Sequence, residues 1–117
     1  MSLTVTLKQN DTRPIQDITL LQPDPDDPTA LIAVDLTLAS SAKILASTSP
    51  ASMPAFTSTL ALASDRTTGI VTWTPIASDT AVVGKLLAEI QVTFAGGGVE
   101  TYPNDGYFEI SIVADLG

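Results

Sequence analysis

The clearest pattern of hydrophobic and polar positions lies in the last third of the chain, from Gly84 onward. Leu86, Ala88, Ile90, Val92 and Phe94 alternate there with Leu87, Glu89, Gln91 and Thr93. A period of two residues is typical of a β-strand with one buried face. The glycines at 96–98 predict a turn, because glycine enters positive φ without steric cost. We therefore expect residues 99–102 to return as the partner strand of a hairpin.

A second turn and a closing strand complete this unit. Residues 103–106 read Pro-Asn-Asp-Gly, in which proline fixes φ and the other three tolerate left-handed geometry. Phe108, Ile110, Ile112 and Ala114 then alternate with Tyr107, Glu109 and Ser111. The last third is therefore predicted to form a three-stranded antiparallel unit.

Shorter strands are predicted along the rest of the chain. They cover residues 3–8, 15–22, 32–38, 42–46, 59–63 and 70–74, separated by segments rich in Pro, Gly, Asp and Asn. No long segment has the 3.6-residue period of an amphipathic helix. This rhythm favours a single domain over residues 1–117 with an immunoglobulin-like antiparallel β-sandwich of seven or eight strands. A barrel is the structural alternative.

The inward positions of these strands predict the core. We expect burial between two sheets of Val71, Trp73, Leu86, Ala88, Ile90, Val92, Phe94, Phe108, Ile110 and Ile112. Trp73 lies on a predicted strand, so we expect it in the core rather than on the surface. Tyr102 and Tyr107 flank a predicted turn, where a tyrosine can form a hydrogen bond back to the backbone.

Composition then narrows the functional classes. The formal net charge is −8, and the chain contains neither histidine nor cysteine. An acidic chain is repelled by phosphate backbones, so we expect no nucleic-acid partner. The apolar runs are shorter than a membrane span, so we expect no membrane partner. Without histidine and cysteine the chain lacks the commonest general base and the thiolate nucleophile, so we expect no enzyme activity, no catalytic residues and no cofactor.

The acidic side chains offer the only candidate metal or acid–base chemistry. Asp24, Asp26 and Asp27 lie in a loop that lacks the length and the glycine of a calcium-binding loop. We expect a solvated loop that binds no metal. Asp35, Asp79 and Asp105 could pair as acid and base, but their spacing does not require them to converge, and each is explained by a turn or a strand end.

The candidate contact surface is the loop over residues 47–57. It is weakly charged and carries Met53, Pro54 and Phe56, apolar residues that a lone domain has little reason to expose. We expect these three residues to contact other proteins. The first strand, residues 3–8, is expected to lie at a sheet edge with unpaired backbone groups.

A family resemblance gives these features a context. Residues 69–74 read Gly-Ile-Val-Thr-Trp-Thr, residues 84–94 form the alternating strand, and residues 100–107 read Glu-Thr-Tyr-Pro-Asn-Asp-Gly-Tyr. This pattern, with weaker matches at residues 7–15 and 34–37, resembles the N-terminal domain family of tailed-phage baseplate upper proteins. The resemblance covers nearly the whole chain, and its most specific part is the turn between Tyr102 and Tyr107.

The resemblance implies a non-enzymatic virion structural protein of a tailed phage. Its partners would be other phage structural proteins, with several copies or a homo-oligomer on the particle, and it would be made in the host cytoplasm. The chain ends at Gly117, so we expect a small tail, baseplate, neck or capsid-decorating component rather than a carrier of receptor-binding proteins. A carbohydrate-binding sandwich for host attachment is the alternative, although few aromatic residues remain for a sugar platform.

Overall fold

A computed structural model describes residues 4–12, 15–49, 55–102 and 107–114. It contains ten β-strands and one short 3₁₀ helix. The elements are β1 (Thr4–Lys8), β2 (Gln16–Thr19), β3 (Leu21–Pro23), β4 (Leu31–Ala33), β5 (Ala39–Ser47), β6 (Phe56–Leu62), η1 (Arg66–Thr68), β7 (Ile70–Trp73), β8 (Gly84–Phe94), β9 (Val99–Tyr102) and β10 (Phe108–Val113). The prediction of an all-β, sandwich-like fold is confirmed. None of the helical residues described forms a segment long and apolar enough to cross a membrane.

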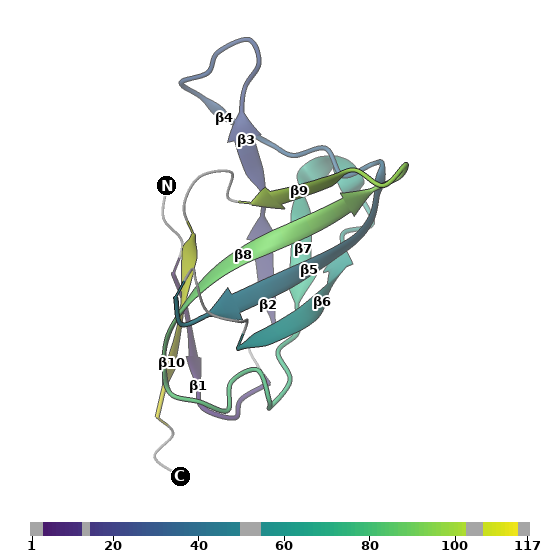
Figure 1. The fold of residues 1–117 in the computed structure, drawn as a ribbon. Helices are drawn as coiled ribbons and strands as arrows, with labels where there is room; N and C mark the ends of the chain where they lie inside the picture. Colours follow the sequence, from purple (N-terminus) through teal and green to yellow (C-terminus); the bar gives the residue numbers. More distant parts are fainter. Residues whose placement is uncertain (1–3, 13–14, 50–54, 103–106, 115–117) are drawn as a thin grey trace.

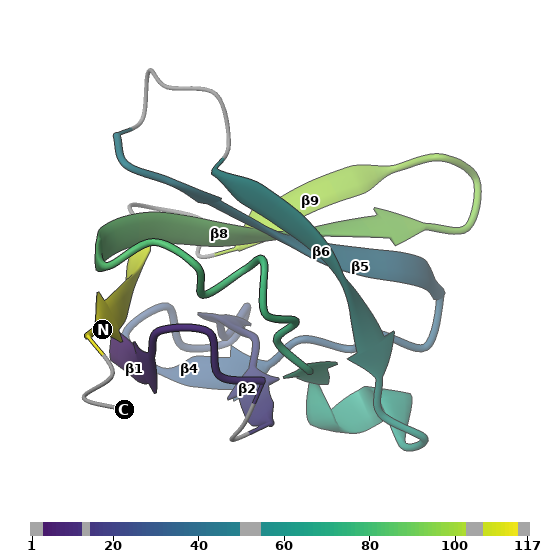
Figure 2. The ribbon, with the colours of Figure 1, turned by 90° about the horizontal axis from the view of Figure 1, so that it is seen from below.

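Eight strands form one curled sheet in the order β1-β10-β8-β5-β6-β7-β2, with β9 paired to β8 outside this path. Strand β6 carries the chain between the two layers, because its first part pairs with β5 and its last two residues pair with β7. Figure 2 shows β5, β6, β8 and β9 above and β1 and β2 below. Strand β1 lies at an edge, as predicted, but it runs parallel to β10 rather than antiparallel.

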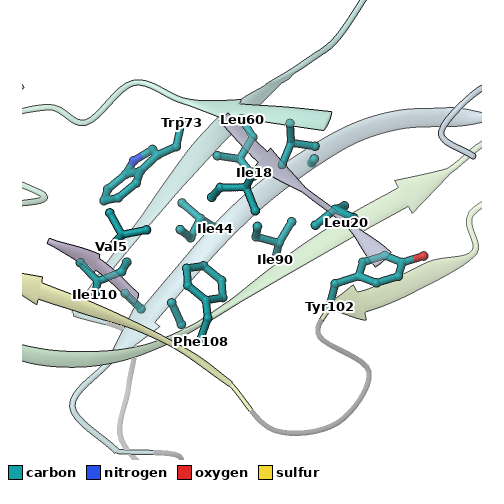
Figure 3. Packing of buried hydrophobic residues seen from close by; sticks show 14 of the residues in the cluster. Val5, Ile18, Leu20, Ile44, Leu60, Trp73, Ile90, Tyr102, Phe108 and Ile110 are labelled. Carbon is teal, nitrogen blue, oxygen red and sulfur yellow. The ribbon is translucent and has the colours of Figure 1, made fainter. Parts of the chain in front are cut away.

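The predicted core is confirmed at nine of its ten positions, and Phe94 is only partly buried against the other nine. Trp73 is fully buried, and its ring stacks on Phe56 with 5.6 Å between centroids. Figure 3 shows Ile44, Ile90, Phe108 and other side chains converging from both layers. Alternation placed these residues correctly because successive side chains on a strand point to opposite faces.

The three-stranded unit of the last third has a different topology from a simple meander. Strand β8 pairs with β10 through its first half, where Phe108 lies opposite Ala88. It pairs with β9 through its second half, where Tyr102 lies opposite Ile90. Strands β9 and β10 therefore share one edge of β8 in series, while β5 occupies the other edge. Ala114, predicted inside the closing strand, is exposed and lies beyond it.

The region between residues 15 and 38 departs most from the prediction. The predicted strand over residues 15–22 is divided at Leu20, whose N–H donates to the Gly69 carbonyl. The predicted strand over residues 32–38 ends at Ala33, because Val34 and Leu36 donate to the carbonyls of Leu20 and Arg66. Their buried side chains follow the predicted period, but their backbones bind loops rather than a neighbouring strand.

Strands β3 and β4 form a separate two-stranded antiparallel sheet, which we call the ribbon. Figure 1 shows the ribbon and its connecting loop projecting from one end of the sandwich. The body is elongated, with principal extents of 49 × 27 × 23 Å. The ribbon is therefore held at one end of the molecule without joining the main sheet.

Candidate interaction surface

The predicted contact residues do not form an exposed apolar loop within the described part of the chain. Met53 and Pro54 lie outside the described residues. Phe56 belongs to β6, is half-buried and packs on Trp73. The predicted loop over residues 47–57 is also shorter, because Ser47 ends β5 and Phe56 begins β6. A contact role for Phe56 would compete with its packing on the core.

The ribbon carries two large apolar side chains that are exposed to solvent. Leu31 is 50% exposed and Ile32 is 38% exposed. Ile32 lies opposite Gln22 in the antiparallel pairing, so the backbone pairing of the ribbon holds Ile32 and Gln22 in place. In the sequence, Ile32 belongs to the alternating run over residues 32–38 together with Val34 and Leu36, which are buried. Its exposure follows from the departure of β4 from the main sheet, which has no local sequence signal.

The acidic loop between β3 and β4 folds by binding its own backbone. The Asp24 carboxylate accepts a hydrogen bond from the Asp26 N–H at 2.9 Å. The Asp27 carboxylate accepts from the Thr29 hydroxyl at 2.6 Å and from the Thr29 N–H at 3.2 Å. These bonds lower the pKa of Asp27, because they stabilise the charged carboxylate. The two carboxylates thereby define the shape of the ribbon tip.

The same Asp-x-Thr turn occurs twice more in the chain. Asp35 accepts from the hydroxyl and N–H of Thr37, and Asp65 accepts from the hydroxyl and N–H of Thr67. The hydrogen bonds from these threonines lower the pKa of both carboxyl groups. The charge of Asp35 opposes the shift at Asp65, which indicates that these two turns lie near each other.

The described carboxylates lie apart from one another or are bound by their own loops. No group of three acidic side chains suited to a metal ion occurs among the residues that the structure describes. Asp79 is buried and accepts the Ile76 N–H at 3.1 Å. Asp35 is occupied by its own turn, and Asp105 lies outside the described residues. The positions of Asp35 and Asp79 therefore give no support to the acid–base pair that the sequence had left open.

The tyrosines and the tryptophan differ in burial and in the hydrogen bonds that their polar atoms form. The Tyr102 hydroxyl donates to the Glu100 carboxylate at 2.6 Å, rather than to the backbone as predicted. Burial, together with Glu100, raises the pKa of Tyr102 well above its ordinary value. Tyr107 is 44% exposed. The Trp73 indole N–H has no hydrogen-bond partner among the described residues.

Comparisons with known proteins give little beyond the fold class. No protein-family model matches the chain, and no curated protein matches it. Among solved structures, the chain is similar to the crystal structure of CopC from Methylosinus trichosporium OB3b, with a TM-score of 0.49 and 11% sequence identity. The match covers 99% of this chain and 89% of that chain.

The sequence-based assignment to a virion structural protein of a tailed phage, with host carbohydrate attachment as its alternative, is wrong. The solved structure described above is CopC, which is not a phage structural protein. The motifs behind the assignment are an alternating strand and a Pro-Asn-Asp-Gly sequence, and both encode local strand and turn preferences that many unrelated β proteins share. The family resemblance itself, the virion location and the phage partners stay predictions that no comparison tests.

Proposed function

We propose that this chain is a non-catalytic β-sandwich module that binds another protein through the ribbon. The observation that carries the proposal is the exposure of Leu31 and Ile32 on a two-stranded sheet separate from the main one. Ordering backbone costs roughly 1–2 kcal/mol per residue, and an isolated hairpin is marginally stable. Apolar side chains held exposed on such an element favour a role in contact with a partner.

The charge of this region indicates the chemistry of the partner. Residues 14–42 contain five aspartates and neither lysine nor arginine. Three of these aspartates, Asp24, Asp26 and Asp27, lie at the ribbon tip beside the exposed apolar pair. Complementary charge speeds association and fixes its register. The partner surface should therefore present an apolar centre with lysine or arginine at its rim.

The side-chain chemistry supports a binding role over a catalytic one. The sequence has neither histidine nor cysteine. The turn aspartates accept hydrogen bonds from their own loops, and Asp79 caps the backbone at Ile76. Tyr102 is held in its protonated form by burial and by Glu100. Each of these groups is committed to the structure of the fold.

A peptide-display selection against the intact chain tests the proposal. Selected peptides should be rich in basic and large apolar residues. The double variant Leu31→Ser/Ile32→Ser should bind them at least about tenfold more weakly, because about 1.4 kcal/mol of apolar contact corresponds to that factor. Fluorescence anisotropy of labelled peptides gives the dissociation constants.

The matched control is Val99→Ser, which removes an apolar side chain that is 53% exposed on β9 instead of the ribbon. It should leave peptide affinity unchanged. Peptides that bind the ribbon variant as tightly as the parent would contradict the proposal, as would a selection that yields no ribbon-dependent peptide. Unchanged urea unfolding of both variants shows that the fold is retained.

A further inference from the structure

A second group of exposed apolar side chains lies at the other end of the molecule. Ile15 is 51%, Ile76 56%, Val82 78% and Val83 48% exposed. We call these four residues the basal patch. They belong to the two segments that precede β2 and β8. In Figure 1 these connecting segments lie at the end of the sandwich opposite the ribbon.

Hydrogen bonds hold the two segments of the basal patch together. The Gln9 side-chain amide donates to the Ala81 carbonyl at 2.8 Å. The Asn10 N–H donates to the Thr80 carbonyl at 3.0 Å, and the buried Thr80 hydroxyl donates to the Asp11 carbonyl at 2.8 Å. Gln16 lies opposite Trp73 in the β2–β7 pairing, which brings Ile15 to the segment that leads to Ile76.

Two exposed lysines lie at this end. Lys8 ends β1 and Lys85 is the second residue of β8. Lys85 and Thr6 lie on either side of Ser111 in β10, so Lys8, two residues after Thr6, faces the same side of the sheet as Lys85. The acids here are Asp11, which is half-buried, Asp79, which is buried, and Asp17, which is exposed two residues after Ile15 and accepts a hydrogen bond from the Thr72 hydroxyl at 2.8 Å. Arg13 and Asp115 lie outside the described residues.

We infer that the ribbon of one copy docks on the basal patch of a second copy, giving a head-to-tail assembly. This inference rests on the proposed function and names the partner as the same chain. The ribbon combines exposed apolar side chains with aspartates, and the basal patch combines exposed apolar side chains with lysines. These complementary surfaces lie at opposite ends of a body 49 Å long.

The geometry of such a contact sets the form of the assembly. It joins two different surfaces, so a pair of bound copies leaves one ribbon and one basal patch free. Association then continues beyond a dimer unless the rotation between copies closes a ring. The net charge of −8 opposes the approach of identical copies. The contact must therefore use the local lysines, and assembly should increase with protein concentration.

Cysteine cross-linking tests which surfaces meet, because the chain has no native cysteine. One preparation carries Ile32→Cys on the ribbon and the other carries Val82→Cys in the basal patch. Mixed under mild oxidation, they should form predominantly the heterodimeric disulfide. Predominant Ile32→Cys homodimers would indicate ribbon-to-ribbon pairing, and a statistical mixture, in which the heterodimer is only about half of all dimers formed from equal amounts of the two variants, would indicate random collision. Both results would overturn the inference.

Charge reversal supplies an independent measurement. Sedimentation velocity should show a mass above the 12.2 kDa monomer that rises with concentration. The double variant Lys8→Glu/Lys85→Glu should have a weaker association constant, by up to about fivefold, which is the effect expected when exposed ion pairs are lost. Adding Asp26→Lys should restore part of the association, whereas the control Lys43→Glu, on an exposed position of β5, should leave it unchanged.

Failure of this inference can be separated from failure of the proposed function. A chain that stays monomeric at all concentrations and forms no heterodimeric disulfide overturns head-to-tail assembly. If the same chain still binds displayed peptides through Leu31 and Ile32, the ribbon remains a site for a different protein. If neither self-association nor peptide binding depends on the ribbon, both proposals are wrong.

Discussion

At the scale of single residues, Gly69 is a position at which the surrounding backbone leaves no room for a side chain. Its φ is +70°, in the left-handed region, and it follows η1 as the C-terminal cap. A Cβ at this position would lie 2.9 Å from the Leu20 carbonyl oxygen and 3.0 Å from the backbone N and O of Val34. Three chain segments that are distant in sequence therefore meet at a site without space for a methyl group.

Gly69→Ala should destabilise the fold by more than the roughly 1–2 kcal/mol that a left-handed conformation costs. The added methyl group must also displace backbone atoms rather than flexible side chains. Urea unfolding monitored by Trp73 fluorescence measures the effect. The matched control is Gly97→Ala, where φ is +93° but no atom lies within 4 Å of the new Cβ. Equal losses in the two variants would contradict the close approach at Gly69.

At the scale of elements, the ribbon and the strands of the main sheet differ in how they are held. Strand β8 is hydrogen bonded along one edge by β5 and along the other by β9 and β10. Strands β3 and β4 pair only with each other among the described residues. The ribbon should therefore open locally at a lower free energy than the main sheet.

Native-state hydrogen exchange should show this difference directly. The backbone amide of Ile32, which lies opposite Gln22 in the ribbon, should exchange at least about tenfold faster than those of Ile44 in β5 and Ile90 in β8, because ribbon opening exposes little core. The comparison is made after correction for intrinsic exchange rates. Equal protection of the ribbon and the main sheet would indicate that they unfold as one unit.

At the scale of the whole molecule, the three Asp-x-Thr turns link stability to pH. Threonine hydrogen bonds lower the pKa of Asp27, Asp35 and Asp65 below the ordinary value of 3.8. A group with a lowered folded-state pKa contributes stability above its unfolded-state pKa, and this contribution is lost as pH falls through the folded-state pKa. The turns should therefore stabilise the chain near neutral pH and cease to do so in strong acid.

Protonation also reduces the repulsion within a chain of net charge −8, which stabilises the folded state in acid. A single pH profile cannot separate these effects, so the measurement is the difference between variants. Asp65→Asn should be less stable than the parent at pH 7, and the difference should shrink below about pH 4.

The control for charge alone is Asp26→Asn, because no hydrogen bond to the Asp26 carboxylate occurs among the described residues. It should show no comparable difference at pH 7. A pH-independent difference for Asp65→Asn would contradict the role of its ionised carboxylate.

Elements with local signals could be predicted from the amino-acid sequence. Alternation from Leu86 to Val92 and the glycines at 96–98 determined β8 and its hairpin, because strand period and turn chemistry depend on neighbouring residues. The inward positions also predicted the burial of Trp73. The all-β class followed from the repetition of such signals along the chain.

The pairing of strand edges and the exposure of particular apolar residues depend on long-range contacts and could not be predicted from local signals. Ile32 and Leu36 share the same sequence period, yet Ile32 is 38% exposed on the ribbon and Leu36 is fully buried. From the sequence we predicted that Met53, Pro54 and Phe56 contact other proteins. In the described part of the chain Phe56 packs on Trp73, and Leu31 and Ile32 are exposed on the ribbon. Period two fixes the alternation of faces within a strand, but the face that meets the core depends on partners that are distant in sequence.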